Sequence, residues 1–169
     1  IKVMDSSVIC HPAVVARLEE LGVSYEVTEH PAVFTIGEMD ALGLTAKGEV
    51  CKNLFLRDAK GRRHFLVVVP GEARADLRAL AAQLESSKLS FASAERLEKY
   101  LGLKQGEVTP LGVLNDADAA VEVVFDRGLE RFPCLGVHPN DNTATVWLSL
   151  ADILRVVEGN GNEIRWVTL

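Results

Sequence analysis

The chain has 169 residues, of which 48% are hydrophobic and 25% are charged, and its formal net charge is −6 at pH 7. This balance is typical of a soluble globular protein with a sizeable core, and it excludes an intrinsically disordered chain. The acidic net charge argues against a protein that coats duplex DNA, because non-specific DNA affinity depends on Lys and Arg neutralising phosphates.

The chain contains no apolar run near the roughly 18 residues that span a bilayer. The apolar run at 65–70 is far shorter, and no charged-then-apolar leader opens the chain. We therefore expect no membrane association and a cytoplasmic protein. Because the chain begins with Ile1, we also expect that its native start is missing.

The cysteines predict neither a disulfide framework nor a metal site. Cys10, Cys51 and Cys134 are an odd number without CxxC spacing, which is typical of a reducing compartment. Cys134 and His138 lie four residues apart, but no second pair of ligands accompanies them, and a zinc site usually needs three or four.

The first half of the chain predicts helices and strands in alternation. Residues 12–22 begin with Pro, carry apolar residues at helical spacing and end in Gly, which predicts a helix. Residues 24–30 alternate as a strand, and residues 35–44 predict a short helix. Two apolar runs, 52–58 and 62–70, flank a Gly-containing turn and predict a β-hairpin.

The second half predicts further elements of both kinds. Residues 72–84 and 93–102 predict amphipathic helices, and residues 104–116 predict a loop. The remaining elements are predicted as a strand, a second hairpin, a helix and a last strand, over 119–126, 134–138 with 143–150, 149–159, and 163–169.

Two successive hairpins argue against a purely parallel, doubly wound sheet, whose strands would all be joined by helical crossovers. We predict a mixed α/β fold, with one compact mixed β-sheet or partial barrel and surrounding helices. We expect a single domain over residues 1–169.

Three polar insertions interrupt this pattern. Strand alternation places Lys52 on the same face as Leu54 and Leu56, so its side chain either reaches water at the strand end or enters a cavity. Gly106 and Pro110 bracket a loop that either presents backbone groups to a ligand or simply connects two elements.

The third insertion is the turn at 138–143. Asn140, Asp141 and Asn142 supply the residues that a turn needs, and His138 is surplus to it. His138 could form one wall of a cavity that Lys52 enters from another strand.

The charge is unevenly distributed. Residues 47–78 contain eight basic and four acidic residues, a net charge of +4, and the remainder has a net charge of −10. This stretch is either a solvated surface or a local face for nucleic acid. Four of its basic residues belong to the first hairpin and are our candidate contacts to nucleic-acid phosphates: Arg57, Lys60, Arg62 and Arg63.

Five segments in register give a resemblance to a known family: 52–58, 89–103, 106–116, 125–129 and 138–146. Together they resemble the bacterial prolyl-tRNA editing family, which comprises free-standing aminoacyl-tRNA deacylases of YbaK-type fold related to the insertion domain of prolyl-tRNA synthetase. The resemblance runs from about residue 10 to the C-terminus. It implies a hydrolase for the ester of mischarged tRNA(Pro), without metal or organic cofactor, and prolyl-tRNA synthetase as a second partner.

The same resemblance implies roles for particular residues. Lys52, Gly106 and His138 match the family's active-site lysine, the first glycine of its Gly-x-x-x-Pro loop and its pocket histidine. The substrate-binding region would include five further residues, of which Asp141 and Asn142 would first of all shape the loop: Thr35, Asn53, Pro110, Asp141 and Asn142.

Within the family, the sequence most resembles the branch acting on alanyl-tRNA(Pro), and the branch acting on cysteinyl-tRNA(Pro) is the nearest alternative. Two other classes stay open: a nucleic-acid-binding module without catalysis and a small-ligand-binding regulator. The chain contains no helix-turn-helix, zinc-finger or basic-zipper pattern, so we expect no specific binding to duplex DNA.

Overall fold

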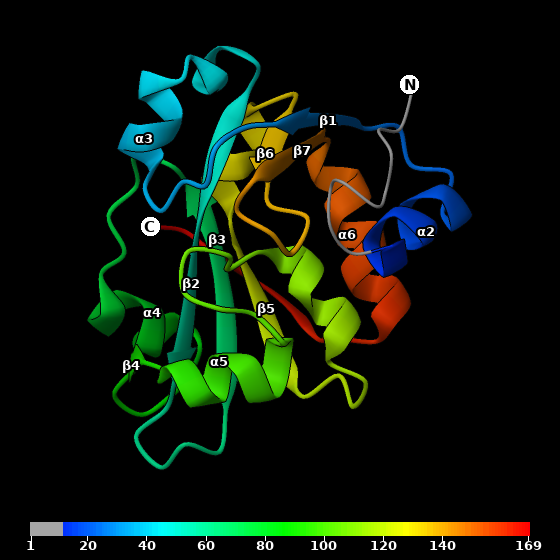
Figure 1. Ribbon diagram of the computed structural model, residues 1–169. Helices are drawn as coiled ribbons and strands as arrows, with labels where there is room; N and C mark the ends of the chain where they lie inside the picture. Colours follow the sequence, from blue (N-terminus) through cyan, green and yellow to red (C-terminus); the bar gives the residue numbers. More distant parts are fainter. Residues whose placement is uncertain (1–11) are drawn as a thin grey trace.

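A computed structural model describes residues 12–169, which form a mixed sheet with helices on both faces (Figure 1). The strand order is β1-β7-β6-β2-β3-β5-β8, and β4 pairs with β2 off this path. The strands are β1 (Glu26–Glu29), β2 (Glu49–Arg57), β3 (His64–Pro70), β4 (Ser90–Phe91), β5 (Val121–Asp126), β6 (Leu135–Val137), β7 (Ala144–Leu148) and β8 (Ile164–Val167). The predicted mixed sheet is confirmed, since β2 pairs antiparallel with β3 but parallel with β6.

Five α-helices and three 3₁₀-helices belong to the described part of the chain. The α-helices are α2 (Pro12–Glu20), α3 (Ile36–Ala41), α4 (Leu77–Gln83), α5 (Ala94–Leu101) and α6 (Leu150–Asn160). The 3₁₀-helices are η1 (Leu44–Ala46), η2 (Pro110–Asn115) and η3 (Arg127–Arg131). Over residues 12–169, no helix has the length and hydropathy to cross a membrane. Cys10 lies outside the described residues.

β3 is the centre of the core, and all seven of its residues are buried. Because successive side chains of a strand point to opposite faces, its residues divide between two apolar clusters. Leu66 and Val68 pack in the cluster covered by α2, α5 and α6, whereas Val67 and Val69 pack in the cluster covered by α4. Figure 1 shows α2 and α6 on one side of the sheet and α4 on the other.

β2 is paired along one edge but only partly paired along the other. One edge of it pairs with β3 from Cys51 to Arg57. On its other edge β6 pairs only at Glu49 and Val50, and β4 only at Leu56 and Arg57. Over residues 12–169, no strand pairs with the stretch between these two contacts. β2 and β6 therefore separate after Val50, and the gap provides space for a site.

Four elements differ from the sequence prediction. The helix expected at 72–84 begins only at Leu77, because the Asp76 side chain caps it by accepting from the backbone N–H of Arg78 and Ala79. The helix expected at 35–44 ends at Ala41, and η1 follows after Gly43 in the left-handed conformation. The loop expected at 104–116 contains η2, and the two-residue strand β4 was not predicted.

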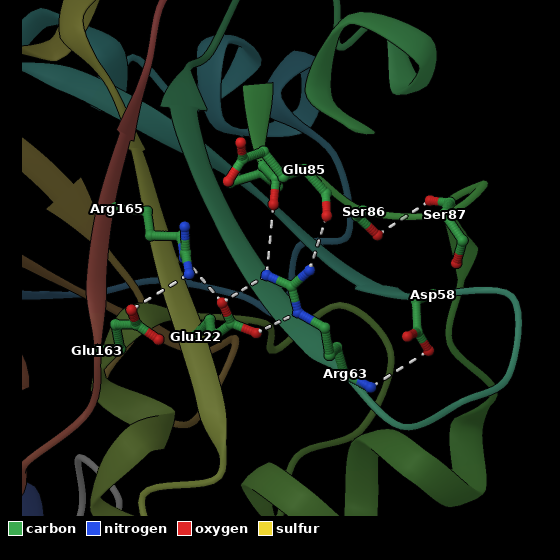
Figure 2. Close-up of polar contacts among 9 residues, drawn as sticks. Asp58, Arg63, Glu85, Ser86, Ser87, Glu122, Glu163 and Arg165 are labelled. Atoms are coloured by element: carbon green, nitrogen blue, oxygen red, sulfur yellow. Dashed lines mark hydrogen bonds and ion pairs between the residues drawn. The ribbon is translucent and has the colours of Figure 1, made fainter. Parts of the chain in front are cut away.

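An ionic network joins the residue before β3 to β5 and β8 (Figure 2). The Glu122 carboxylate accepts from Arg63 Nε at 3.0 Å, from Arg63 Nη2 at 2.9 Å and from Arg165 Nε at 2.8 Å. Arg63 also donates to the backbone oxygens of Leu84 and Glu85, which follow α4. Burial favours a raised pKa for the Glu122 carboxyl, but the hydrogen bonds and charges of the two arginines outweigh it, so the pKa is lowered.

We predict that Glu122→Gln lowers the free energy of unfolding by about 1–3 kcal/mol near pH 7, because it removes a partly buried charge bound by two arginines. A depressed carboxyl pKa stabilises the fold above the ordinary value of 4.5, and this contribution is lost as the pH falls through the folded-state pKa. Urea denaturation at a series of pH values should therefore show the free energies of unfolding of Glu122→Gln and the unmodified protein converging at acidic pH. The control Glu130→Gln breaks an exposed pair with Arg127 and should change the stability by less than about 1 kcal/mol. Equal effects of the two changes would contradict the prediction.

Candidate functional site

A cavity of about 190 Å³ lies where β2 and β6 separate. Four segments distant in sequence line it: the chain around the start of α3, the first half of β2, the loop before η2, and the end of β6. The lining residues are Val33, Phe34, Thr35, Ile36, Met39, Val50, Cys51, Lys52, Asn53, Gly106, Val108 and His138. The structure thus brings together five of the predicted site residues, which are Thr35, Lys52, Asn53, Gly106 and His138.

Lys52 lines this cavity from β2. Leu54 and Leu56 pack in the cluster under α4, together with Ala73, and the Lys52 ammonium reaches the carbonyl oxygen of Ala73 at 3.5 Å. This is the upper limit of a hydrogen bond, and the part of the chain that the structure describes offers Nζ no other. Since an ammonium group has three donors, Lys52 has donors available for a ligand.

His138 is held as a neutral ring. Its Nδ1 lies 2.9 Å from the carbonyl oxygen of Ala144, and because a carbonyl only accepts, Nδ1 carries the proton. Burial lowers the pKa of His138, although the hydrogen bond to Ala144 opposes this. Nε2 is then an acceptor at neutral pH. His30 lies close by, at 6.3 Å between ring centroids.

The polar turn after His138 is held by its own side chains. Asn140 is buried with φ +63°, a left-handed conformation that Asn tolerates. Asp141 Oδ1 accepts from the backbone N–H of Thr143 at 2.7 Å and from its hydroxyl. Asn142 Nδ2 donates to the Val33 carbonyl at 3.1 Å, and Val33 N–H donates to the Asn142 carbonyl at 3.2 Å. The turn is thereby fixed to the chain that enters α3.

Gly106 is required by its surroundings. Its φ is +86°, and a Cβ at this position would lie 2.5 Å from Phe34 Cδ1 and 2.9 Å from Phe34 Cε1. Only glycine both adopts this backbone conformation without strain and leaves room for the ring. The loop backbone therefore lies directly against Phe34 at the cavity.

Asn53 and Thr35 differ in what they offer to a ligand. Asn53 Oδ1 is buried and finds no hydrogen-bond donor among residues 12–169, so it is an unpaired acceptor in a residue that lines the cavity. The Thr35 hydroxyl caps α3 by accepting from Glu38 N–H at 3.1 Å, so this oxygen already has a structural task.

Three predicted substrate-binding residues do not line the cavity. Pro110 is buried at the start of η2. Asp141 and Asn142 lie in the turn described above, where both side chains bind within the protein. Their observed contacts are those of residues that shape the loop.

The four basic residues of the first hairpin lie away from the cavity. Lys52 pairs with Val69 near one end of the hairpin, and Arg57 pairs with His64 at the other, roughly 17 Å along the strand. Figure 1 shows α3 at the top of the molecule and the hairpin turn at the bottom. Arg57 donates to the carbonyls of Asp58 and Ala59, and Arg63 binds Glu122, which leaves Lys60 and Arg62 exposed.

The structure also reveals site residues that the sequence did not single out. Most are the apolar lining residues Val33, Ile36, Met39, Val50 and Val108, which look like ordinary core positions in the sequence. Phe34 also lines the cavity, although its side chain is largely exposed. Among the described residues, no group of three or more His, Cys, Asp or Glu could hold a metal ion, and Cys134 and His138 belong to no such group.

Comparison with known proteins shows which family the chain resembles. The family model described as aminoacyl-tRNA editing domain matches residues 30–156. The chain is 50% identical over 157 residues to the "Prolyl-tRNA editing protein ProX" of Acetoanaerobium sticklandii, covering 93% of this chain and 96% of that protein. It is 38% identical over 143 residues to the "Prolyl-tRNA synthetase associated domain-containing protein 1" of Danio rerio, covering 83% of this chain and 77% of that protein.

The fold itself matches solved structures. A crystal structure described as a candidate trans-editing enzyme for prolyl-tRNA synthetase superposes with a TM-score of 0.70 over 95% of this chain and 99% of that chain. Its sequence identity is 22%, so this match supports the fold alone.

We predict that Gly106→Ala displaces the Phe34 ring and costs about 1–2 kcal/mol in backbone strain. The control is Gly22→Ala, because Gly22 has a similar φ of +65° but a Cβ there would meet no atom within 4 Å. Both variants should lose comparable stability in urea, whereas only Gly106→Ala should shift the Phe34 ring resonances in an NMR spectrum of ¹³C-labelled protein. Unshifted Phe34 resonances would show that the loop accommodates the methyl group without moving the ring.

Proposed function

The chain belongs to the aminoacyl-tRNA editing domain family, and from this premise we propose that it hydrolyses mischarged tRNA(Pro) in trans, with alanyl-tRNA(Pro) as its preferred substrate. It is an aminoacyl-tRNA deacylase, and the name of its relative from Acetoanaerobium sticklandii supports prolyl-tRNA as the tRNA. The preference for alanine rests on family likeness, and cysteinyl-tRNA(Pro) is the alternative substrate.

One observation supports the proposal: a single small cavity is lined by a lysine, an asparagine with an unpaired amide oxygen, a histidine with a lowered pKa and a glycine loop. Its volume of about 190 Å³ is below the ~300–1,000 Å³ of pockets that enclose drug-sized ligands. A small amino acid attached to ribose fits that scale. Apolar side chains such as Val33, Met39 and Val108 would surround its methyl group.

The proposed reaction needs no protein nucleophile, because an aminoacyl ester is already activated. Water adds to the ester carbonyl carbon, the bond from that carbon to the ribose oxygen breaks, and that oxygen takes up a proton. The products are the free amino acid and tRNA. The protein has to position the water and stabilise the oxyanion.

We assign the polar groups of the cavity to these tasks. The Lys52 ammonium would hold the developing oxyanion or a terminal phosphate, since two of its three donors remain beside the contact with Ala73. Asn53 Oδ1 and His138 Nε2 are acceptors, and the substrate's α-ammonium group is a donor that suits either of them. Backbone groups of the loop at Gly106 would orient water, and the terminal ribose hydroxyl could assist proton transfer.

The partners that we propose are tRNA(Pro) and prolyl-tRNA synthetase. Of the four basic residues in the first hairpin, exposed Lys60 and Arg62 are better placed to meet tRNA phosphates than Arg57 and Arg63, which bind internal acceptors. Since these residues lie far from the cavity, they would contact a part of the tRNA remote from its 3′ end. We expect the enzyme to work in the cytoplasm, where tRNA is charged.

We predict that Lys52→Ala lowers the single-turnover rate of alanyl-tRNA(Pro) hydrolysis by about 10²- to 10³-fold, the usual effect of losing one oxyanion-stabilising donor. The matched control is Lys47→Ala, because Lys47 is an exposed lysine of the same basic stretch outside the cavity. The assay follows release of labelled amino acid from alanyl-, cysteinyl- and prolyl-tRNA(Pro).

Each alternative has its own signature in that assay. A parental rate in Lys52→Ala would remove the role given to this lysine. Faster release of cysteine than of alanine by the unmodified protein would identify the cysteinyl branch. Amino-acid binding without release would support a regulator, and duplex binding without release would support a nucleic-acid-binding module.

We predict that His138→Ala changes the ratio of alanyl to prolyl hydrolysis more than it changes stability, because the ring forms part of the cavity wall. Since burial depresses its pKa below the ordinary 6.5, the neutral ring is present above that value. The His138-dependent part of the rate should then be lost as the pH falls through the depressed pKa. The rate of His138→Ala, measured over the same pH range, supplies the baseline. Equal loss on every substrate with a large fall in Tm would instead indicate a structural role.

A further inference from the structure

Phe34 is exposed where an aromatic side chain is normally buried. Its side chain is 65% exposed, and only three other large apolar residues are exposed in the described chain: Leu42, Phe91 and Leu169. Of the four, only Phe34 lines the cavity. Because Phe34 is exposed and also lines the cavity, its ring face is available for stacking against a flat ligand group.

The ring is also held in place. Val33 before it is buried and bound to Asn142 through two hydrogen bonds, and Thr35 after it caps α3. One edge of the ring, Cδ1 and Cε1, lies against Gly106. The chain thus fixes the ring at its backbone and along one edge while most of its surface stays in solvent. A fixed aromatic surface loses little conformational freedom when a flat ligand stacks on it.

The proposed substrate has such a flat group in the right place. Its amino acid is esterified to the ribose of the terminal adenosine, so the adenine is attached to the same sugar as the reacting ester. A cavity of about 190 Å³ cannot enclose the amino acid, the ribose and the adenine together. When the ester lies beside Lys52, the adenine must therefore remain at the cavity mouth.

We propose that Phe34 is the platform on which the 3′-terminal adenine of the tRNA stacks, with Gly106 setting the position of the ring. This inference rests on the proposed deacylase function and adds a positioning contact to it. Stacking on an aromatic ring is a common way to bind single-stranded nucleic-acid ends. Because the terminal adenine is common to all aminoacyl-tRNAs, Phe34 fixes the ester in the cavity without distinguishing amino acids.

The first test compares side chains at position 34. Phe34→Ala should lower kcat/KM for alanyl- and cysteinyl-tRNA(Pro) by the same factor, roughly 5- to 150-fold, the effect of losing one stacked base. Phe34→Tyr should keep the parental rate, and Phe34→Leu should behave like Phe34→Ala. The matched control is Phe91→Ala, since Phe91 is 64% exposed and lies on β4, at the far end of β2 from the cavity. A parental rate in Phe34→Leu would overturn the proposal, because an apolar cover for the cavity would then suffice.

The second test removes the base. Alanyl-tRNA(Pro) with an abasic 3′-terminal ribose should react with the unmodified enzyme as slowly as the intact substrate reacts with Phe34→Ala. On the abasic substrate, Phe34→Ala should have no further effect. Equal effects of Phe34→Ala on both substrates would overturn the stacking contact.

A binding measurement separates this inference from the proposed function. Uncharged tRNA(Pro) carrying 2-aminopurine as its 3′ residue should change fluorescence on binding the unmodified protein and Phe34→Tyr, but not Phe34→Ala. If the unmodified protein released no amino acid, the proposed function would fail, and the fluorescence change would still report the stacking. The same signal with Phe34→Ala as with the unmodified protein would overturn the inference while leaving the deacylase function intact.

Discussion

One edge of β2 pairs with two different strands, β6 and β4, and the site depends on the unpaired stretch between these two pairings. β6 pairs with it at Glu49 and Val50, and β4 pairs with it at Leu56 and Arg57. Unpaired backbone polar groups are costly unless water or a ligand reaches them, so the intervening stretch is suited to a cavity rather than to the core. Lys52 and Asn53 belong to that stretch.

Packing beside the unpaired stretch of β2 holds the walls of the cavity in place. Val33, Met39 and Val50 form a small apolar cluster with Trp147, whose ring needs the space above Gly136, where a Cβ would lie 2.6 Å from it. The indole N–H donates to the Thr28 hydroxyl at 3.0 Å. Packing against Trp147 of β7 therefore holds α3 against β2. The turn after His138 holds the chain before α3 through the hydrogen bonds between Asn142 and Val33. The cavity is enclosed by elements that support one another, as a preformed site requires.

Local patterns predicted much of the fold. Period-two alternation placed Lys52, Leu54 and Leu56 on one face, and turn residues located both hairpins, because these signals act between neighbours in sequence. The late start of α4 was missed because residues 72–76 contain no Gly or Pro to separate them from the helix, while the cap at Asp76 decides where the helix begins. The two residues of β4 are too few to give a pattern at all.

The site was predictable only in part, for the same physical reason. The resemblance indicated Lys52, Asn53, Gly106 and His138, which the structure brings to one cavity. Periodicity alone could not have predicted that these residues share a cavity. They come from separate segments, and the order of the strands in the sheet determines that these segments are neighbours. Arg57, Lys60, Arg62 and Arg63 follow Lys52 closely in sequence, but an extended strand places them at the opposite end of the hairpin from the cavity. Phe34 gave no signal, since an exposed and a buried phenylalanine look alike in a sequence.

Selection of the wrong amino acid must then depend on the cavity itself. Correctly and wrongly charged tRNA(Pro) share the same adenine, ribose and phosphates, so the contacts proposed at Phe34 and at the basic hairpin would strengthen binding to both equally. Only the walls that touch the amino acid can separate them, and a methylene group in an apolar pocket is worth about 1–3 kcal/mol. Where the cavity walls cannot move, a steric clash with a larger amino acid discriminates more strongly than favourable contacts with a smaller one. The hydrogen bond from Asn142, the cap at the start of α3 and the close approach at Gly106 each restrain one wall. Under the proposed function, these restraints would help the cavity to exclude the larger prolyl group.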